Sequence, residues 1–179
     1  QSFMKAHLDK NVVPVCKHFP GQGSAGGDTH EGIVDVTKTW SETELKPYQT
    51  LMDQDCIPAI MTSHLFHKEL DPELPATLSS KILTDLLRNK MGFEGVIISD
   101  DPHMGAIANH YDLKTVLQRI IYASVDIFCF GNNLIYDPSI VQKIHSTIVE
   151  LLDEGSIAIA QIENSYKRIM NLKTRIGLL

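Results

Sequence analysis

The sequence predicts an α/β fold, a (β/α)8 TIM-type barrel of which this chain supplies roughly strands five to eight and their helices. Short apolar runs alternate with segments of helical periodicity, as a parallel α/β fold requires. Polar side chains able to do chemistry follow each apolar run. No Ser/Gly linker or low-complexity tract divides the chain, so residues 1–179 are expected to form one unit, the C-terminal half of a single barrel domain.

The predicted strands are near-continuous apolar runs rather than runs that alternate apolar with polar residues. This pattern is typical of strands that are buried on both faces of a parallel sheet. The four runs cover residues 12–16, 57–61, 95–98 and 125–130.

Segments with the spacing of amphipathic helices lie between and after these strands. A weak helical segment around Met4 precedes the first strand, and Ser41 with Glu44 three residues later reads as a capping box. The other predicted helices begin at residue 79 or 80 and cover 113–124, 138–153 and 157–175, and Gly155 separates the last two.

The polar residues that follow the strands favour a barrel over a doubly wound sheet. In a barrel the carboxyl ends of all strands surround one site. The four clusters are Lys17–His18, Thr62–His64, Ser99–Asp101 and Gly131–Asn133. Because a full barrel needs about 250 residues, we expect the first four strands to come from the same polypeptide or from a companion chain.

Composition excludes some classes of function. The net charge is −6, and no basic stripe is present to neutralise phosphates, so nucleic acid is not an expected partner. No apolar stretch approaches the roughly 20 residues of a membrane span. Hydrophobic residues make up 43% of the chain, which is ordinary for a globular domain with a packed core.

A glycine-rich loop follows the first predicted strand. Gly21, Gly23 and Gly26 formally match the dinucleotide fingerprint GxGxxG, but the fingerprint must open a helix and residues 27–32 are a poor helix start. We therefore expect a mobile loop that carries functional groups rather than a nucleotide site.

Asp28 and His30 are the functional candidates in that loop. Residues i and i+2 of an extended segment share a face, so the Asp28 carboxylate is expected to accept a hydrogen bond from one imidazole nitrogen. That bond would orient the ring and leave the other nitrogen for a substrate.

Asp100 is the strongest candidate for a nucleophile or metal ligand. It follows a predicted strand, and a carboxylate at a strand end in a barrel mouth is a common position for either role. The neighbouring Asp101 is expected to cap the following turn.

The motifs together resemble one family. KHFPGQG at residues 17–23 followed by DTH at 28–30 closely resembles the KHFPGHG…DSH signature of the glycoside hydrolase family 3 N-acetylhexosaminidases. MTSH, LPATLS and GFEGVIISDD match the same family in order, at residues 61–64, 74–79 and 92–101. The resemblance spans about residues 10–135, and Gln22 replaces the usual histidine of the first motif.

The resemblance implies retaining hydrolysis of terminal N-acetyl-β-D-glucosaminides, such as fragments of peptidoglycan or chitin, without a metal or other cofactor. Asp100 would form a covalent glycosyl-enzyme, and His30 with Asp28 would act as acid and base. The remaining implied site residues bind the glycan or line its pocket; they are Lys17, His18, His64 and Met104.

Other functions remain open from the residues alone. A metallohydrolase could use His18, His64 and Asp100; a phosphorylase of the same family would replace water with phosphate; and a non-catalytic module would hold amino sugars without cleaving them. The sequence leaves the compartment undecided, with bacterial cytoplasm and periplasm both possible.

Overall fold

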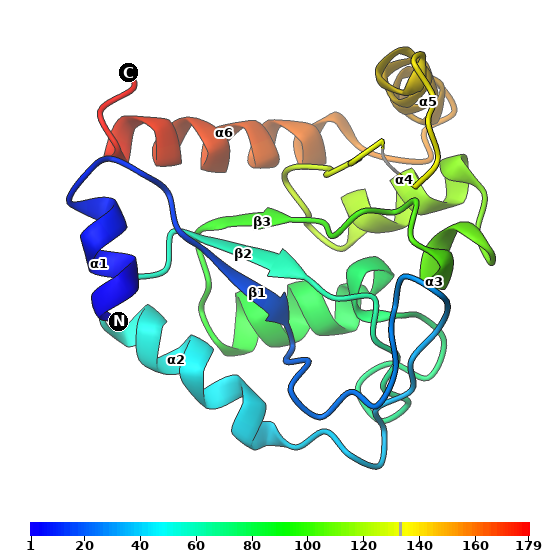
Figure 1. Ribbon diagram of the computed structural model, residues 1–179. Coiled ribbons are helices and arrows are strands. Elements are labelled where there is room, and N and C mark those ends of the chain that lie inside the picture. Colours follow the sequence, from blue (N-terminus) through cyan, green and yellow to red (C-terminus); the bar gives the residue numbers. More distant parts are fainter. Residues whose placement is uncertain (133) are drawn as a thin grey trace.

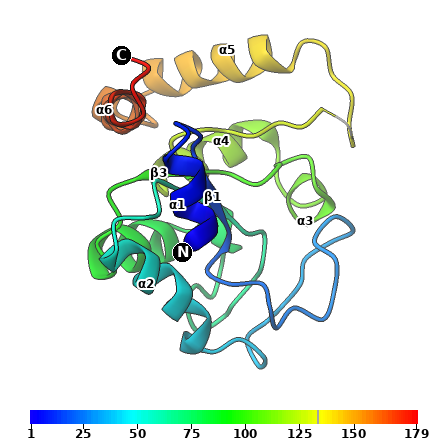
Figure 2. The same ribbon diagram turned by 60° about the vertical axis from the view of Figure 1, so that its left-hand side comes forward.

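The computed structural model describes residues 1–132 and 134–179, and it has a parallel sheet surrounded by helices. The strands are β1 (Val15–Phe19), β2 (Ala59–Thr62) and β3 (Val96–Ile98), in the order β1-β2-β3. Figures 1 and 2 show the strands between α6 on one side and α2 on the other. The predicted α/β class with a parallel sheet is confirmed.

The first strand begins three residues later than expected, at Val15 instead of Val12. Pro14 has no N–H group to donate to a strand ladder, so strand pairing begins after it. Between Cys16 and Phe19 the register with β2 shifts by one residue, which is a β-bulge at Lys17–His18. Bulges re-aim side chains next to functional sites.

The expected fourth strand, 125–130, is wrong as a regular strand. It makes a single parallel bridge between Ile98 and Ile127. The cause lies in its own side chains, because the Asp126 carboxylate accepts the Ile97 N–H at 2.8 Å in place of a main-chain carbonyl. Arg88 and Arg168 hold the same buried carboxylate at 2.8 and 2.7 Å.

The helices follow the predicted order, with short additional turns. Their bounds are α1 (Ser2–Leu8), η1 (Glu42–Leu45), α2 (Lys46–Asp53), η2 (Ala76–Leu78), η3 (Lys81–Lys90), α3 (Gly105–Ala108), α4 (Leu113–Tyr122), α5 (Ile140–Asp153) and α6 (Ile159–Arg175). Here η1 and η2 are 3-10 turns, whereas η3 has π-helical hydrogen bonding.

The predicted capping box at Ser41 is wrong. The Ser41 side chain makes no capping hydrogen bond. The Glu44 carboxylate reaches back to the glycine-rich loop instead, where it accepts the Gly23 N–H at 3.0 Å. Glu44 therefore ties η1, the turn that leads into α2, to the loop that follows β1.

The core forms where the apolar faces of η3 and α4 meet the sheet. Leu87 of η3, Leu117 of α4 and Ile97 of β3 are completely buried. At roughly 1.5–3 kcal/mol for each fully buried aliphatic side chain, this cluster holds the strand ends in place. In the described ranges, no helix is both long and apolar enough to cross a membrane.

Candidate active site

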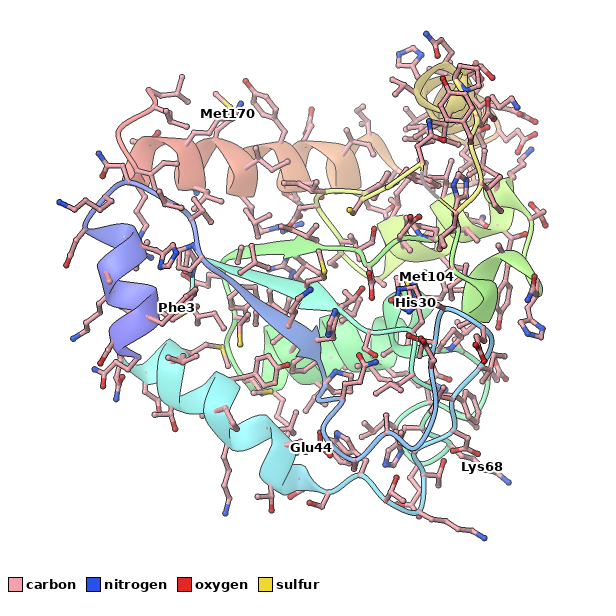
Figure 3. The ribbon with its side chains drawn as sticks, viewed as in Figure 1. Phe3, His30, Glu44, Lys68, Met104 and Met170 are labelled. Atoms are coloured by element: carbon pink, nitrogen blue, oxygen red, sulfur yellow. The ribbon has the colours of Figure 1, made fainter. Side chains whose placement is uncertain are left out.

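The carboxyl ends of the three strands bring together residues from distant parts of the sequence. His18 near the end of β1, Thr62 at the end of β2 and Asp100 after β3 meet at this edge of the sheet. His18 Nε2 lies 3.8 Å from Asp100 Oδ2. Figure 3 shows the side chains that crowd this end of the sheet, near the labelled His30 and Met104.

The two oxygens of the Asp100 carboxylate have different surroundings. Oδ1 accepts the N–H of Asp101 at 2.9 Å, whereas Oδ2 faces His18. The backbone N–H of Asp100 donates to Thr62 Oγ1 at 3.1 Å. With a side chain 19% exposed, Asp100 is fixed by its backbone and by Oδ1, and Oδ2 is the oxygen that a ligand could reach.

Asp101 caps the turn that follows β3, as expected from the sequence. Its carboxylate accepts the backbone N–H of His103 at 2.9 Å with one oxygen and that of Gly131 at 3.0 Å with the other. These bonds cap the turn after β3 and connect it to the segment that follows Ile127. Asp101 therefore holds the surroundings of Asp100 and does not face the opening.

His18 is half-buried, and burial is the main cause that lowers the pKa of its imidazole below the usual value. The Asp100 carboxylate opposes this shift, while the charges of Lys17 and His30 add to it. The net lowering of the His18 pKa favours a neutral imidazole beside Asp100.

Lys17, the neighbour of His18 on β1, is exposed, and the Lys17–His18 and Phe19–Pro20 peptide bonds are cis.

Asp28 and His30 form the pair that their spacing predicts. Asp28 Oδ1 lies 2.6 Å from His30 Nδ1 and also accepts the His30 backbone N–H at 2.9 Å. The backbone bond first and the ring bond second lower the pKa of Asp28, so this carboxylate is ionised over a wide pH range. Both side chains are 60% exposed, and within the described part of the chain His30 Nε2 has no hydrogen-bond partner.

The loop that carries His30 is docked on the start of α3, a few residues after Asp100. Gly105 N–H donates to the His30 carbonyl at 3.0 Å, and Ala106 N–H donates to the Thr29 carbonyl at 3.3 Å. A Cβ atom on Gly105 would lie only 2.8 Å from the His30 carbonyl oxygen. The loop expected to be mobile is thus fastened by backbone bonds next to the site.

His64 and Met104 do not lie where a pocket-lining role requires. His64 is completely buried and Met104 is 3% exposed. Both His64 ring nitrogens already have partners within the chain, Nδ1 with Thr77 Oγ1 at 2.8 Å and Nε2 with the Asp101 carbonyl at 2.9 Å. Their predicted direct contact with the glycan is therefore not favoured by this geometry.

Sequence reasoning missed Thr77 and gave no role to Thr62. Thr77 Oγ1 lies 2.8 Å from Thr62 Oγ1, and both residues are completely buried. Their only sequence signal was membership in the LPATLS and MTSH motifs.

In the fourth strand-end cluster, residues 131–133, the described members make hydrogen bonds that hold the backbone. Gly131 N–H donates to Asp101, and the Asn132 side chain exchanges hydrogen bonds with the backbone of Asp137 at 2.7 and 3.2 Å. Asn133, the last member of this cluster, lies outside the described residues.

Metal-binding geometry is absent from the described ranges 1–132 and 134–179, where no three His, Cys, Asp or Glu side chains are grouped to hold an ion. The metallohydrolase hypothesis required His64, whose two ring nitrogens both have hydrogen-bond partners within the chain.

A cavity of about 380 Å³ lies away from this site, at the amino-terminal ends of β2 and β3, and includes Pro58, Gly95 and Arg175 in its lining.

Comparison with known proteins agrees with this arrangement. Residues 1–172 match the family described as "Glycosyl hydrolase family 3 N terminal domain". An "Uncharacterized secreted glycosyl hydrolase" of Arthroderma benhamiae is 32% identical over 182 residues, covering 98% of this chain and 50% of that protein. A "Beta-hexosaminidase" of Nitrosomonas eutropha is 34% identical over 125 residues, 68% of this chain and 35% of that protein.

A solved structure is similar over almost the whole chain. The glycoside hydrolase family 3 β-N-acetylglucosaminidase from Paenibacillus sp. has a TM-score of 0.85 and 27% identity, covering 97% of this chain and 33% of that one. The chain thus spans between a third and a half of the length of these proteins. The family match, the relatives and the shared fold show together that the chain belongs to glycosyl hydrolase family 3, within its N-terminal domain.

Proposed function

We propose that the protein hydrolyses terminal N-acetyl-β-D-glucosaminides with retention of configuration, using Asp100 as nucleophile and His30 with Asp28 as acid and base. The observation that carries this proposal is the state of the Asp100 carboxylate. One oxygen is held by the Asp101 N–H, and the other, which accepts no hydrogen bond from residues 1–132 or 134–179, faces His18 at the strand ends. A fixed carboxylate with one accessible oxygen suits attack on an anomeric carbon.

The first step would form the covalent glycosyl-enzyme. Asp100 Oδ2 attacks the anomeric carbon, the glycosidic C–O bond breaks, and protonated His30 gives the proton on Nε2 to the leaving oxygen. Asp28 supports this step because its ionised carboxylate stabilises the imidazolium through Nδ1.

The second step would release the sugar. His30 Nε2 takes a proton from water, whose oxygen attacks the anomeric carbon and displaces the Asp100 carboxylate. Many retaining enzymes use two carboxyl groups about 5–5.5 Å apart. A histidine on a docked loop takes the place of the second carboxyl group in this proposal.

The substrate class rests on the relatives and on the DTH loop. The relatives from Nitrosomonas eutropha and Paenibacillus sp. are named β-hexosaminidase and β-N-acetylglucosaminidase. Exposed Lys17 and half-buried His18 at the end of β1 would hold the sugar hydroxyls. Peptidoglycan fragments and chitin oligosaccharides are the glycans of this class.

We also propose that residues 1–179 form the C-terminal half of one (β/α)8 barrel, with the other four strands supplied by the same polypeptide or a companion chain. Exposed apolar side chains support this proposal, since Val15 of β1 and Ile127, which bridges to β3, are 37% and 38% exposed, and Val12 just before β1 is 50% exposed. Additional strands would cover these side chains and pair with the free edge of β1.

The decisive experiment replaces Asp100 with Asn in the full-length protein and measures release of an aryl group from an aryl N-acetyl-β-glucosaminide. Loss of the charge should abolish turnover, because an amide oxygen is a poor nucleophile. Asp153→Asn, at the exposed end of α5, is the matched control and should keep full activity. Normal turnover by Asp100→Asn would rule out the nucleophile, and products formed with and without phosphate separate hydrolysis from phosphorolysis.

A further inference from the structure

A buried set of hydrogen bonds holds the Asp100–Asp101 backbone at both ends. At one end the Asp100 N–H donates to Thr62 Oγ1 at 3.1 Å. At the other end His64 Nε2 lies 2.9 Å from the Asp101 carbonyl. Thr77 Oγ1 connects the two ends, at 2.8 Å from Thr62 Oγ1 and 2.8 Å from His64 Nδ1.

The chemistry of the donors fixes the direction of these bonds at His64. A carbonyl oxygen can only accept, so His64 Nε2 must carry the proton that it shares with Asp101. The ring is completely buried, and burial lowers its pKa, which favours the neutral imidazole. In a neutral ring with a proton on Nε2, Nδ1 has none and accepts the Thr77 hydroxyl proton.

The remaining proton positions follow from Thr77. Its hydroxyl oxygen also lies 2.8 Å from the Ser63 carbonyl, which could accept the same proton, but the hydroxyl has only one proton to give. Given to His64, that proton satisfies the unprotonated Nδ1, and the Ser63 carbonyl keeps the Thr77 backbone N–H as a donor at 3.0 Å. Once the Thr77 proton is given to His64, its oxygen accepts from the Thr62 hydroxyl, whose oxygen accepts from Asp100. Every bond then runs in one sense, from the Asp100 N–H to the Asp101 carbonyl.

We infer that Thr62, Thr77 and neutral His64 are positioning residues for the nucleophile, which they hold by clamping the Asp100–Asp101 backbone from behind the site. This inference rests on the proposed function of Asp100. None of the three residues touches a substrate, because each is completely buried. Chained hydrogen bonds strengthen one another in a low-dielectric interior, which makes such a clamp stiff.

The clamp matters because covalent attack depends on the direction of one oxygen. Oδ1 is held by the Asp101 N–H, so movement of the Asp100–Asp101 backbone would turn Oδ2 away from its line of attack. A misplacement of about 1 Å in a reacting group can cost about 100-fold in rate.

The experiment compares Thr62→Val with Thr62→Ser in the full-length protein, using aryl N-acetyl-β-glucosaminides with good and poor leaving groups. Thr62→Val removes the hydroxyl with little change in volume and should lower kcat about 10- to 100-fold, with KM nearly unchanged. The loss should be equal for both leaving groups, because attack and not protonation is impaired. Thr62→Ser keeps the hydroxyl and should restore most of the rate.

A measurement on the unaltered protein tests the clamp without activity. Nitrogen NMR of the imidazole of His64, assigned by its loss in His64→Gln, should report a neutral ring protonated on Nε2. A proton on Nδ1 in the neutral ring, or a wild-type rate in correctly folded Thr62→Val, would overturn the inference.

These outcomes also separate the inference from the proposed function. If the full-length protein cleaves no such glycoside, the proposed function fails, and the positioning role fails with it even where the tautomer agrees. Only the positioning role fails if the protein is active, Asp100→Asn is inactive, and folded Thr62→Val has the rate of the unaltered protein. Thermal unfolding of each variant distinguishes a lower rate from a smaller folded fraction.

Discussion

Asp100 and His30, the two groups proposed to share one reaction, are held in opposite ways. Asp100 follows a strand of the core and is fixed through buried Thr62 at its backbone and through Asp101 at Oδ1. His30 sits on a loop with a side chain 60% exposed, held by its Asp28 partner and by backbone bonds to α3. Attack requires one fixed direction, whereas a proton donor must serve both a leaving group and a water.

After the loss of turnover expected for Asp100→Asn, the largest effect should come from removing His30, the exposed member of this comparison. His30→Ala should lower kcat/KM for poor leaving groups about 100- to 10,000-fold, the usual contribution of general acid catalysis. Activated aryl leaving groups need little protonation and should lose much less. Steady-state kinetics over a series of phenols measures this dependence, with exposed His110→Ala as control. An equal loss for all leaving groups would contradict the acid role.

A smaller effect should come from displacing the His30 loop without touching its side chains. In Gly105→Ala the new Cβ would lie 2.8 Å from the carbonyl oxygens of both His30 and Glu31, so the loop must move. We expect kcat/KM for poor leaving groups to fall about 10-fold, since small misplacements of a catalytic group are costly.

The matched control for this displacement is Gly32→Ala. A Cβ there meets no atom within 4 Å, so activity should be unchanged. Equal activity of Gly105→Ala and Gly32→Ala would indicate that docking on α3 is unimportant for catalysis.

The smallest effect concerns the free energy of unfolding and its dependence on pH, which should reflect buried His64 behind Asp100. Burial lowers the pKa of His64, so the unfolded chain binds a proton there at a higher pH than the folded protein does. The free energy of unfolding should therefore be greatest above the ordinary histidine value of 6.5 and should fall as the pH drops below it. Half-buried His18 acts in the same direction.

Urea titrations at several pH values measure this dependence. His64→Gln should flatten the slope below pH 6.5, whereas exposed His110→Gln should leave it in place. An unchanged slope in His64→Gln would show that the buried ring is not its source.

The order of elements was readable from the sequence because it depends on apolar periodicity. All the expected helical segments occur, and three of the four apolar runs contain strand residues. The fourth run failed because periodicity does not reveal that the Asp126 side chain takes the place of a ladder carbonyl. The boundary error at Val15 had a visible cause, since Pro14 is in the sequence.

The candidate site was readable only in part. The Asp28–His30 contact was predicted for an extended segment, whereas the structure has a turn at residues 29–30 in which Asp28 also accepts the His30 backbone N–H. The contact is local in sequence in either case, so it could be predicted. His64 was misplaced because a histidine beside a strand end reads the same whether its ring faces the opening or the core. Its contact with Thr77, 13 residues away, depends on the path of the chain between them.

The glycine-rich loop has a consequence for how such loops are interpreted. Gly21 has a φ of +123°, and a Cβ there would lie 2.5 Å from Glu44 Oε2, the oxygen that also accepts the Gly23 N–H. The loop thus binds an anion from the protein's own chain, the Glu44 carboxylate, where a nucleotide-binding loop would bind a phosphate. The same glycine spacing can therefore arise from internal charge satisfaction. At this φ a side chain at residue 21 would remain strained even if Glu44 were shortened, so Gly21 should not tolerate substitution with or without a change at Glu44.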